Sequence, residues 1–294
     1  MAGALPPSPV PGILLMVSAF GFFVSMDTIA KYLSQSYPVA AVTWARYLMN
    51  LLVLLAFLAV RGDLGRVKTS RPGIQLARGV LLLSSTFFYF SSLTVLPLAE
   101  AAAIGFVMPL FVGLLAIPML GERLDLSRTV AIFVGMAGAL LIVRPGTAVF
   151  TPYALLPVGM AFTNALYQIL TRKVAGVEHP LTSLVWGAIV GAILMSLAAP
   201  FYWVTPQKAE HWGLLLVMGV FASVGHYLLI KSYEYASATL LAPFTYTAMV
   251  WAVLLGYLVF GNFPDAWSLT GMAVIVGAGL FLAGRHRLAV RRGT

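Results

Sequence analysis

The stretch "AKYLSQSYPVAAVTWAR" at residues 30–46 has a counterpart, "RKVAGVEHPLTSLVWGA", at residues 172–188. Aligned, the two stretches match at three positions that are always 142 residues apart: Lys31 with Lys173, Pro38 with Pro180, and Trp44 with Trp186. A basic, a cyclic and an aromatic residue that recur at one offset indicate a duplication rather than a chance likeness of apolar helices. The sequence therefore predicts two homologous halves, 1–146 and 147–294.

The composition of the chain indicates a membrane protein. Of its 294 residues, 61% are hydrophobic and 9% are charged, whereas soluble domains carry roughly 25% charged residues. Cysteine is absent, which excludes disulfides, iron–sulfur clusters and thiolate zinc sites. The N-terminal "MAGALPPSPVPG" has no Lys or Arg, so we expect the first apolar segment to be a permanent span rather than a cleaved signal peptide.

Ten apolar stretches of about 18–24 residues are each long enough to cross a bilayer as a helix. They cover residues 12–33, 39–60, 73–96, 99–119, 127–144, 152–173, 181–203, 211–233, 238–260 and 266–284. The predicted fold class is an all-α integral membrane protein with ten transmembrane helices. Because each half holds an odd number of spans, the second half must insert upside down relative to the first. Inverted repeats of this kind enclose a substrate cavity near the bilayer midplane.

The basic residues predict the orientation. If both termini are cytoplasmic, 14 of the 18 Lys and Arg residues lie on the inner side, as the positive-inside rule requires. The four that remain on the outer side are Lys31, Arg46, Arg144 and Lys208. We therefore expect a multi-pass protein of the bacterial inner (cell) membrane. The net charge of +9 follows from this topology and does not indicate a nucleic-acid partner.

A "GERL" after the fourth predicted span and the span endings "VGMAGALLIV" and "VIVGAGLFLA" resemble the EamA-type branch of the drug/metabolite transporter superfamily. Within it, the chain is most similar to the YddG-like exporters of aromatic and other hydrophobic amino acids. The resemblance implies a basket of ten helices in which spans 1, 3, 4, 6, 8 and 9 surround a central cavity. "GERLD" at 121–125 corresponds to "GNFPD" at 261–265, where Asn262 replaces the usual Glu, so any family role of that Glu falls to Glu122.

Helical spacing identifies candidate cavity residues. In the sixth span, four polar residues recur at i, i+3, i+4 and i+7 and so share one helix face: Asn164, Tyr167, Gln168 and Thr171. A polar stripe is costly against lipid and is expected to face protein or water. The full predicted substrate-binding set is Phe22, Met26, Thr86, Tyr89, Phe90, Asn164, Tyr167, Gln168, His226 and Tyr246. The alternative for these polar stripes is helix packing.

This set is rich in rings, amides and hydroxyls, which suits a small amphipathic solute such as an amino acid. No Arg or Lys stands out at mid-span, which argues against phosphate-bearing substrates. Lys31 and Lys173 are expected to anchor helix ends, and Asp27 is expected to pair with Lys31 one turn later. No cofactor or metal is expected. The expected partners are a small-molecule substrate and the lipid bilayer, with the chain acting as a monomer.

An enzyme is not expected, because the sequence has neither H-E-x-x-H nor G-x-S-x-G and no second intramembrane His beside His226. Two alternatives to amino-acid export stay open. One is export of other small metabolites or drugs, and the other is channel-like facilitation on the same fold. Substrate counterflow separates a carrier from a pore, because only a carrier shows trans-stimulation.

Four prolines are candidates for gating: Pro97, Pro109 and Pro118 in and before the fourth span, and Pro243 in the ninth. Proline removes a helix hydrogen bond and can bend a span. We expect the hairpins of spans 3–4 and 8–9 to flex and to open the cavity alternately to either side. The alternative is a static kink that only shapes packing.

The predicted orientation can be tested with single cysteines in this cysteine-free chain. An impermeant maleimide should label Gln207→Cys in intact cells, and it should label Gly62→Cys only after the membrane is permeabilised. Labelling of Gly62→Cys in intact cells would reverse the topology, and with it the direction of export.

Overall fold

The computed structural model describes residues 9–120, 126–144, 151–174, 177–236 and 238–292, and the regular structure in these residues is helical. The α-helices are α1 (Val10–Leu33), α2 (Val39–Val60), α3 (Pro72–Leu93), α4 (Leu98–Gly105), α5 (Met108–Leu120), α6 (Leu126–Val143), α7 (Leu155–Val174), α8 (Pro180–Ala198), α9 (Ala209–Tyr235), α10 (Ala238–Leu241), α11 (Thr247–Phe260) and α12 (Ala266–Arg292). Short 3-10 helices lie between them: η1 (Leu64–Val67), η2 (Pro152–Ala154), η3 (Ala199–Phe201) and η4 (Ala242–Tyr246). Glu122 lies outside the described residues.

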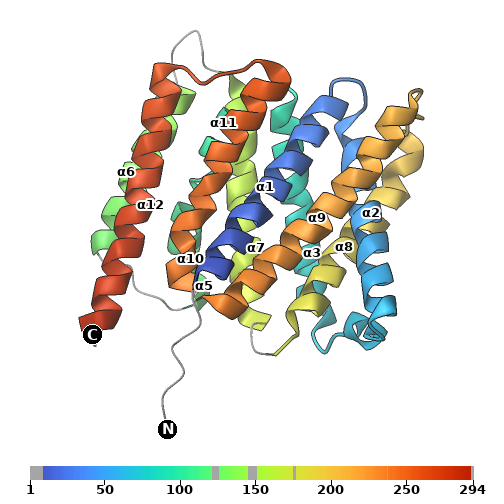
Figure 1. The fold of residues 1–294 in the computed structure, drawn as a ribbon, viewed down its shortest axis with the longest axis horizontal. Helices are drawn as coiled ribbons and strands as arrows, with labels where there is room; N and C mark the ends of the chain where they lie inside the picture. Colours follow the sequence, from blue (N-terminus) through green and yellow to red (C-terminus); the bar gives the residue numbers. More distant parts are fainter. Residues whose placement is uncertain (1–8, 121–125, 145–150, 175–176, 237, 293–294) are drawn as a thin grey trace.

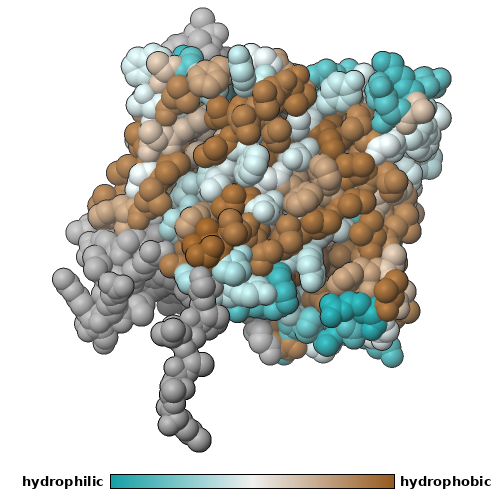
Figure 2. Space-filling model, in the orientation of Figure 1, coloured by the Kyte–Doolittle hydropathy of each residue, from teal (hydrophilic) through white to brown (hydrophobic). Residues whose placement is uncertain are grey.

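Among the described residues, eight helical segments are long and apolar enough to cross a membrane, and two shorter apolar helices cover Thr129–Val143 and Ala266–Phe281. These segments fall on the apolar stretches that the sequence predicts. Length and composition therefore support eight of the ten predicted spans. Figure 2 shows hydrophobic residues across the middle of one face and hydrophilic residues towards its ends. This distribution is typical of a protein whose middle is surrounded by lipid.

The arrangement of the helices fits a duplicated chain. Helix α1 corresponds to α7, 142 residues later, and the two run in opposite directions (Figure 1). Helix α1 packs along α9 and α3 packs along α7, while α2 contacts α9 and α8 contacts α3. Each of these contacts therefore occurs twice with the halves exchanged. The start of α1 and the end of α12 lie at the same end of the molecule as η1, and α6 and α12 pair along one side (Figure 1).

Two predicted spans are broken in the structure, which corrects the prediction of continuous helices over 99–119 and 238–260. The fourth is divided into α4 and α5, and the ninth into α10, η4 and α11. At the first break the amides of Phe106, Val107 and Leu110 donate to the carbonyl three residues earlier. Pro109 accounts for this change, because it has no N–H and disfavours an α conformation in the residue before it.

The two breaks meet in space. Phe106, directly after α4, stacks on Tyr246 at the end of η4, with ring centroids 5.1 Å apart and ring planes 26° apart. Tyr246 also packs so closely on Gly279 of α12 that a Cβ there would lie 1.6 Å from its hydroxyl. The candidate gating prolines lie at the start of α4 (Pro97), in the first turn of α5 (Pro109), inside α5 (Pro118) and in η4 (Pro243). That these segments flex stays a prediction.

Two glycines 140 residues apart allow close contacts between helices of the two halves. A Cβ on Gly79 of α3 would lie 2.4 Å from the Cβ of Val190 in α8. A Cβ on Gly219 of α9 would lie 2.2 Å from the Cβ of Met49 in α2 and 2.8 Å from the backbone nitrogen of Asn50. Real atoms cannot approach so closely, so both positions require glycine for the helices to pack as they do.

Gly219→Ala is expected to destabilise the protein by about 1–3 kcal/mol, because the added methyl group collides with backbone in α2. The matched control is Gly213→Ala in the same helix, where nothing lies within 4 Å of the new Cβ. The control should be neutral or stabilising by up to about 1 kcal/mol, since alanine favours helix. Thermal unfolding in detergent measures both, and equal melting temperatures would contradict the close crossing.

Candidate substrate site

A buried arginine lies in the interior of the first half. Arg46 is the eighth residue of α2 and only 7% exposed. Its Nη1 donates to the Thr86 Oγ1 at 2.7 Å and its Nε contacts the Met26 Sδ at 3.3 Å. Its guanidinium also lies 5.8 Å from the centre of the Phe90 ring. The Tyr47 hydroxyl also interacts with this guanidinium, and no acidic residue of the described chain forms an ion pair with Arg46.

Thr86 is held in place for this contact by two further bonds. Its hydroxyl donates to the Leu82 carbonyl at 3.0 Å and shares a hydrogen bond with the Tyr47 hydroxyl at 2.9 Å. Tyr47 is itself buried and places its ring 4.8 Å from the Arg46 guanidinium. The guanidinium is therefore fixed by helices α1, α2 and α3 together.

Asp27 in α1 is an acidic group close enough to Arg46 to interact with it electrostatically. Its carboxyl lies deep in the helical body, where it also acts on the Tyr89 hydroxyl. Part of its surface is still accessible. Arg46 and Asp27 do not form a direct ion pair in the described structure, and Asp27 accepts no hydrogen bond from any described residue.

The predicted pairing of Asp27 with Lys31 is wrong. Lys31 is 7% exposed, and its Nζ donates to the carbonyls of Leu93 at 2.6 Å and Leu96 at 2.7 Å. The Leu93 carbonyl, at the end of α3, has no partner within its helix, and the ammonium satisfies it together with the Leu96 carbonyl in the segment before α4. Lys31 is therefore a buried cap for α3 and not an anchor at the membrane surface, whereas its counterpart Lys173 is exposed.

A second buried arginine links the two halves. Arg78 in α3 is 2% exposed. Its Nε donates to the Thr171 hydroxyl at 2.9 Å, its Nη2 donates to the Tyr167 hydroxyl at 3.3 Å, and its Nη1 donates to Gln75. The guanidinium also lies 5.0 Å from the centre of the Tyr167 ring. All three nitrogens are thus engaged, and the polar face of α7 is joined to α3.

A cavity of about 750 Å³ lies beside Arg78. It is lined by Arg78, Tyr167, Thr171 and His226, and also by Arg66, Glu178 and His179. His226 bonds to the Ala222 carbonyl at 2.8 Å and packs edge-on against Phe23. Because Arg66 belongs to η1, this part of the lining lies at the η1 end of the molecule (Figure 1), which the charge distribution predicts to be cytoplasmic.

The amide pair on α7 makes contacts between helices. Asn164 donates to the Ser85 hydroxyl at 3.3 Å, and Gln168 donates to Asn164 Oδ1 at 3.1 Å. Gln168 also approaches the Met108 Sδ at 2.9 Å. These bonds tie α7 to α3 and to the start of α5, which is the packing alternative that the sequence left open.

The structure thus separates the predicted site residues into groups. Met26, Thr86 and Phe90 gather around Arg46, and Tyr89 lies near Asp27. Tyr167 and His226 line the cavity. The remaining ones pack between helices, with Phe22 edge-on against Phe221, Asn164 with Gln168, and Tyr246 on Phe106. Their roles in binding stay a prediction.

Matched contacts hold the two ends of the molecule. At one end, the Tyr37 hydroxyl bonds to the His211 Nδ1 at 2.6 Å. At the other, Glu178 Oε1 accepts from the Ser70 amide at 2.9 Å, the Ser70 hydroxyl at 2.7 Å and the Thr69 hydroxyl at 2.9 Å. These hydrogen bonds hold the pKa of Glu178 below its ordinary value, and the bond from the Ser70 hydroxyl contributes most.

The repeated tryptophans make equivalent bonds at opposite ends. The Trp44 indole donates to the Ser196 hydroxyl at 2.8 Å, and the Trp186 indole donates to the Val67 carbonyl at 2.9 Å. Each bond joins one half of the chain to the other. The duplication seen in the opening stretches therefore extends to the contacts that those residues make.

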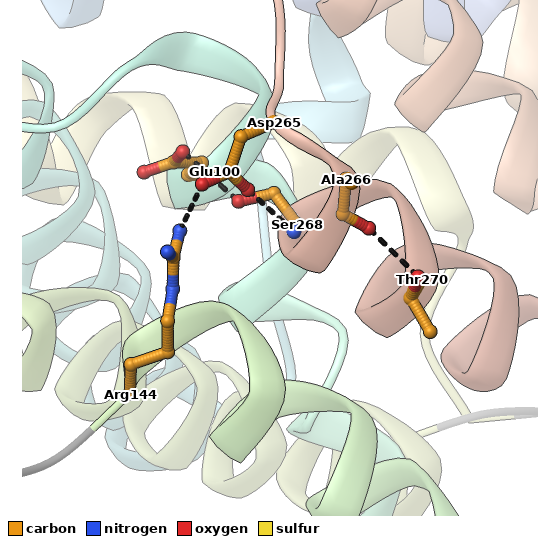
Figure 3. Close-up of polar contacts among 6 residues, drawn as sticks. All are labelled: Glu100, Arg144, Asp265, Ala266, Ser268 and Thr270. Atoms are coloured by element: carbon orange, nitrogen blue, oxygen red, sulfur yellow. Dashed lines mark hydrogen bonds and ion pairs between the residues drawn. The ribbon is translucent and has the colours of Figure 1, made fainter.

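A third polar network joins α4, α6 and α12 (Figure 3). Arg144 Nη2 pairs with Asp265 at 2.6 Å, and the Ser268 amide donates to the other Asp265 oxygen at 2.8 Å. The Ser268 hydroxyl donates to Glu100 at 3.1 Å. The hydrogen bonds from Ser268 and from Arg144 lower the pKa of Asp265. Asp265 thus caps α12, which explains the last residue of the "GNFPD" motif.

Comparison with known proteins agrees with this architecture. The model of the EamA-like transporter family matches residues 10–144 and again residues 151–284. The chain belongs to the EamA-like transporter family.

Relatives of this EamA-like transporter are named for several solutes. It is 32% identical over 266 residues to an S-adenosylmethionine uptake transporter of Rickettsia conorii, covering 90% of each chain. It is 29% identical to a riboflavin transporter of Vibrio cholerae, covering 91% of each chain. It is also 29% identical to the pseudopaline exporter of Pseudomonas aeruginosa, covering 92% of this chain and 95% of that one.

A solved structure shares the fold, with a TM-score of 0.67 and 22% identity over 93% of this chain and 97% of the other. The EamA-like assignment confirms the broader resemblance drawn from the sequence and makes the chain a membrane transporter of small metabolites, not an enzyme. These three relatives are not named for amino acids, so the narrower resemblance to amino-acid exporters rests on the sequence alone.

Sequence reasoning missed the two buried arginines of this EamA-like transporter. It placed Arg46 on the outer surface and Arg78 near a span end, and it found no mid-span cation. Position within the span was the available signal, because Arg46 lies seven residues after the first residue of α2. At 1.5 Å per residue this is about 10 Å into the helix, too far for a side chain at the end of a span.

The Glu178 contacts predict a pH effect on the η1 loop. A carboxyl group such as Glu178, whose pKa is lower in the folded protein than in the unfolded chain, stabilises the fold at pH values above its unfolded pKa. This stabilisation is lost as the pH falls through the pKa of the folded state. Protection of the Ser70 amide from hydrogen exchange, corrected for the intrinsic rate, should therefore fall roughly two- to tenfold across that range. Glu178→Gln should show the lower protection already at neutral pH, whereas Glu210→Gln at the other end should not. Unchanged protection in Glu178→Gln would contradict the assignment.

Proposed function

We propose that this EamA-like transporter carries small zwitterionic metabolites that contain an α-amino carboxylate. Amino acids with aromatic or other hydrophobic side chains, and their derivatives, form this class, and the proposed direction is export across the bacterial inner membrane with both termini in the cytoplasm. The observation that carries the proposal is Arg46, a buried cation that forms no ion pair with any described residue.

The geometry of Arg46 favours a carboxylate. Its Nε and Nη1 contact Met26 and Thr86, which are neutral groups, so the positive charge itself is not neutralised by these neighbours. Guanidinium groups bind carboxylates through short, charge-assisted bonds, often two at once. A buried cation without an anionic partner is costly inside a membrane, and a substrate carboxylate would remove that cost.

The surroundings of Arg46 favour an apolar side chain on the substrate. Phe90 and Tyr47 present their rings to the guanidinium, and Tyr89 lies near Asp27. Rings and thioethers contact apolar groups of many shapes. S-adenosylmethionine, for which a relative is named, also contains an α-amino carboxylate, so it belongs to the same chemical class as the amino acids that the sequence suggested.

The proposed mechanism is alternating access by the two repeats, 1–146 and 147–294. The cavity opens at the η1 end, while the opposite end is tied by Lys31, by Tyr37 with His211, and by Arg144 with Asp265. The broken spans α4–α5 and α10–α11 supply segments that can move independently of the longer helices. When the contacts at one end break and equivalent contacts form at the other end, the site would open to each side in turn.

Counterflow in liposomes tests the function. Wild-type protein should show trans-stimulated exchange of methionine, phenylalanine or S-adenosylmethionine, and less exchange of a neutral solute such as riboflavin. Exchange of none of the zwitterions would contradict the proposal, and flux without trans-stimulation would favour a channel-like facilitator.

Arg46→Gln should reduce zwitterion transport by roughly 10- to 150-fold, the effect of losing one charge-assisted hydrogen bond. Arg46→Lys keeps the charge but loses the planar fork, so its transport rate should lie between those of wild-type protein and Arg46→Gln. Arg61→Gln is the matched control, because Arg61 is exposed at the end of the same helix. Normal transport by an Arg46→Gln protein of normal abundance would exclude Arg46 from the site.

A further inference from the structure

Asp27 is the acidic residue whose contacts the fold leaves unexplained. It lies six residues before the end of α1, about 9 Å from that end at 1.5 Å per residue. The other acidic residues in the described helices are all engaged: Glu100 with Ser268, Glu210 with Lys208, and Glu234 with Lys231. Asp27 has no hydrogen-bond or ion-pair partner in the described part of the chain.

Lys31 cannot serve Asp27, because its ammonium is already held by the Leu93 and Leu96 carbonyls. Arg46 acts on Asp27 through space without direct contact. The Arg46 Nε lies 3.3 Å from the Sδ of Met26, the residue before Asp27, and neither charged group forms an ion pair with a described residue. Isolated charges are expensive within a membrane protein unless something compensates them. A zwitterion bound with its carboxylate towards Arg46 and its cationic centre towards Asp27 would compensate both charges at once.

The groups around Asp27 also suit a cation. Phe23 precedes Asp27 by one helical turn and so shares its face of α1, where its ring packs on His226 of α9. Tyr89 approaches from α3 and Arg46 from α2. Aromatic rings attract ammonium and sulfonium ions through their negative faces. A carboxylate bordered by rings therefore selects a positively charged centre, including one without hydrogen-bond donors.

We propose that Asp27 binds the cationic centre of the substrate, an ammonium or a sulfonium, while Arg46 binds its carboxylate. This inference rests on the proposed function and deepens it, because the pair would select zwitterions over simple carboxylates and would fix the substrate in one orientation. Asp27 is then a specificity-determining residue. Its removal changes which solute is carried and leaves recognition of the carboxylate intact.

The test compares methionine with 4-(methylthio)butanoate, which has the same skeleton without the ammonium group, in liposome counterflow. Wild-type protein should prefer methionine by about tenfold or more. Asp27→Asn, which keeps the shape and removes the charge, should bring the ratio close to one by lowering methionine exchange. Asp27→Glu should retain the preference. Glu234→Gln, an exposed acid in α9, is the matched control and should behave as wild type.

The outcomes separate the two proposals. If wild-type protein exchanges neither compound, and exchanges neither phenylalanine nor S-adenosylmethionine, the proposed function itself is overturned. Exchange of methionine with an unchanged preference in Asp27→Asn overturns the role of Asp27 and leaves the proposed function standing. Should Asp27→Asn fail to fold, the amine 3-(methylthio)propylamine gives an independent measurement, because it carries only the cationic half. It should inhibit methionine exchange by wild-type protein, and absence of inhibition overturns the role of Asp27.

Discussion

The guanidinium of Arg46 has to be accommodated about 10 Å along a helix whose other residues are almost all apolar. Water is not available there in quantity, so the charge depends on groups supplied by other helices. Thr86 from α3 and Met26 from α1 supply two contacts, and Tyr47 and Phe90 supply ring faces. Helices α1, α2 and α3 each supply a contact to this one side chain, and the candidate site lies beside it.

Duplication supplied the scaffold, and divergence within it supplied the site. The repeated tryptophans and glycines make the same kind of contact in each half. The repeated lysines do not, because Lys31 is buried under the end of α3 while Lys173 is exposed. The two positions have different surroundings, because cavity-lining residues lie at the η1 end of the molecule, whereas the other end holds the contacts of Lys31, of Tyr37 with His211 and of Arg144 with Asp265. A symmetric fold can therefore contain an asymmetric site.

The helices and the repeat could be predicted from the sequence because both depend on patterns along the chain. Apolar runs define spans through their length alone, and the matched Lys, Pro and Trp residues define the repeat through one offset. The breaks in the fourth and ninth spans were harder to predict, since Pro109 could equally have produced a bend in a continuous helix. The sequence shows the prolines at both breaks, but it does not show that the two breaks meet in space through Phe106 and Tyr246.

The site was predicted less well, because spacing along one helix tells which residues share a face but not which neighbour they reach. Asn164 and Gln168 share a face with Tyr167, yet they bond to α3 and α5 while Tyr167 lines the cavity. The reach of long side chains is a second limit. Lys31 extends to the end of α3 instead of turning back to Asp27, which only the three-dimensional arrangement reveals.

The stack of Phe106 on Tyr246 has a mechanical consequence. Each ring lies at the helix break of its own half, so the stack joins the two broken spans directly. In the proposed transport cycle, displacement of either segment disturbs the contact with the other one. Independent motion of the two segments, which could open a continuous path for ions through the membrane, would first have to separate this ring pair. The proposed coupling of the two halves then depends on the contact between two side chains.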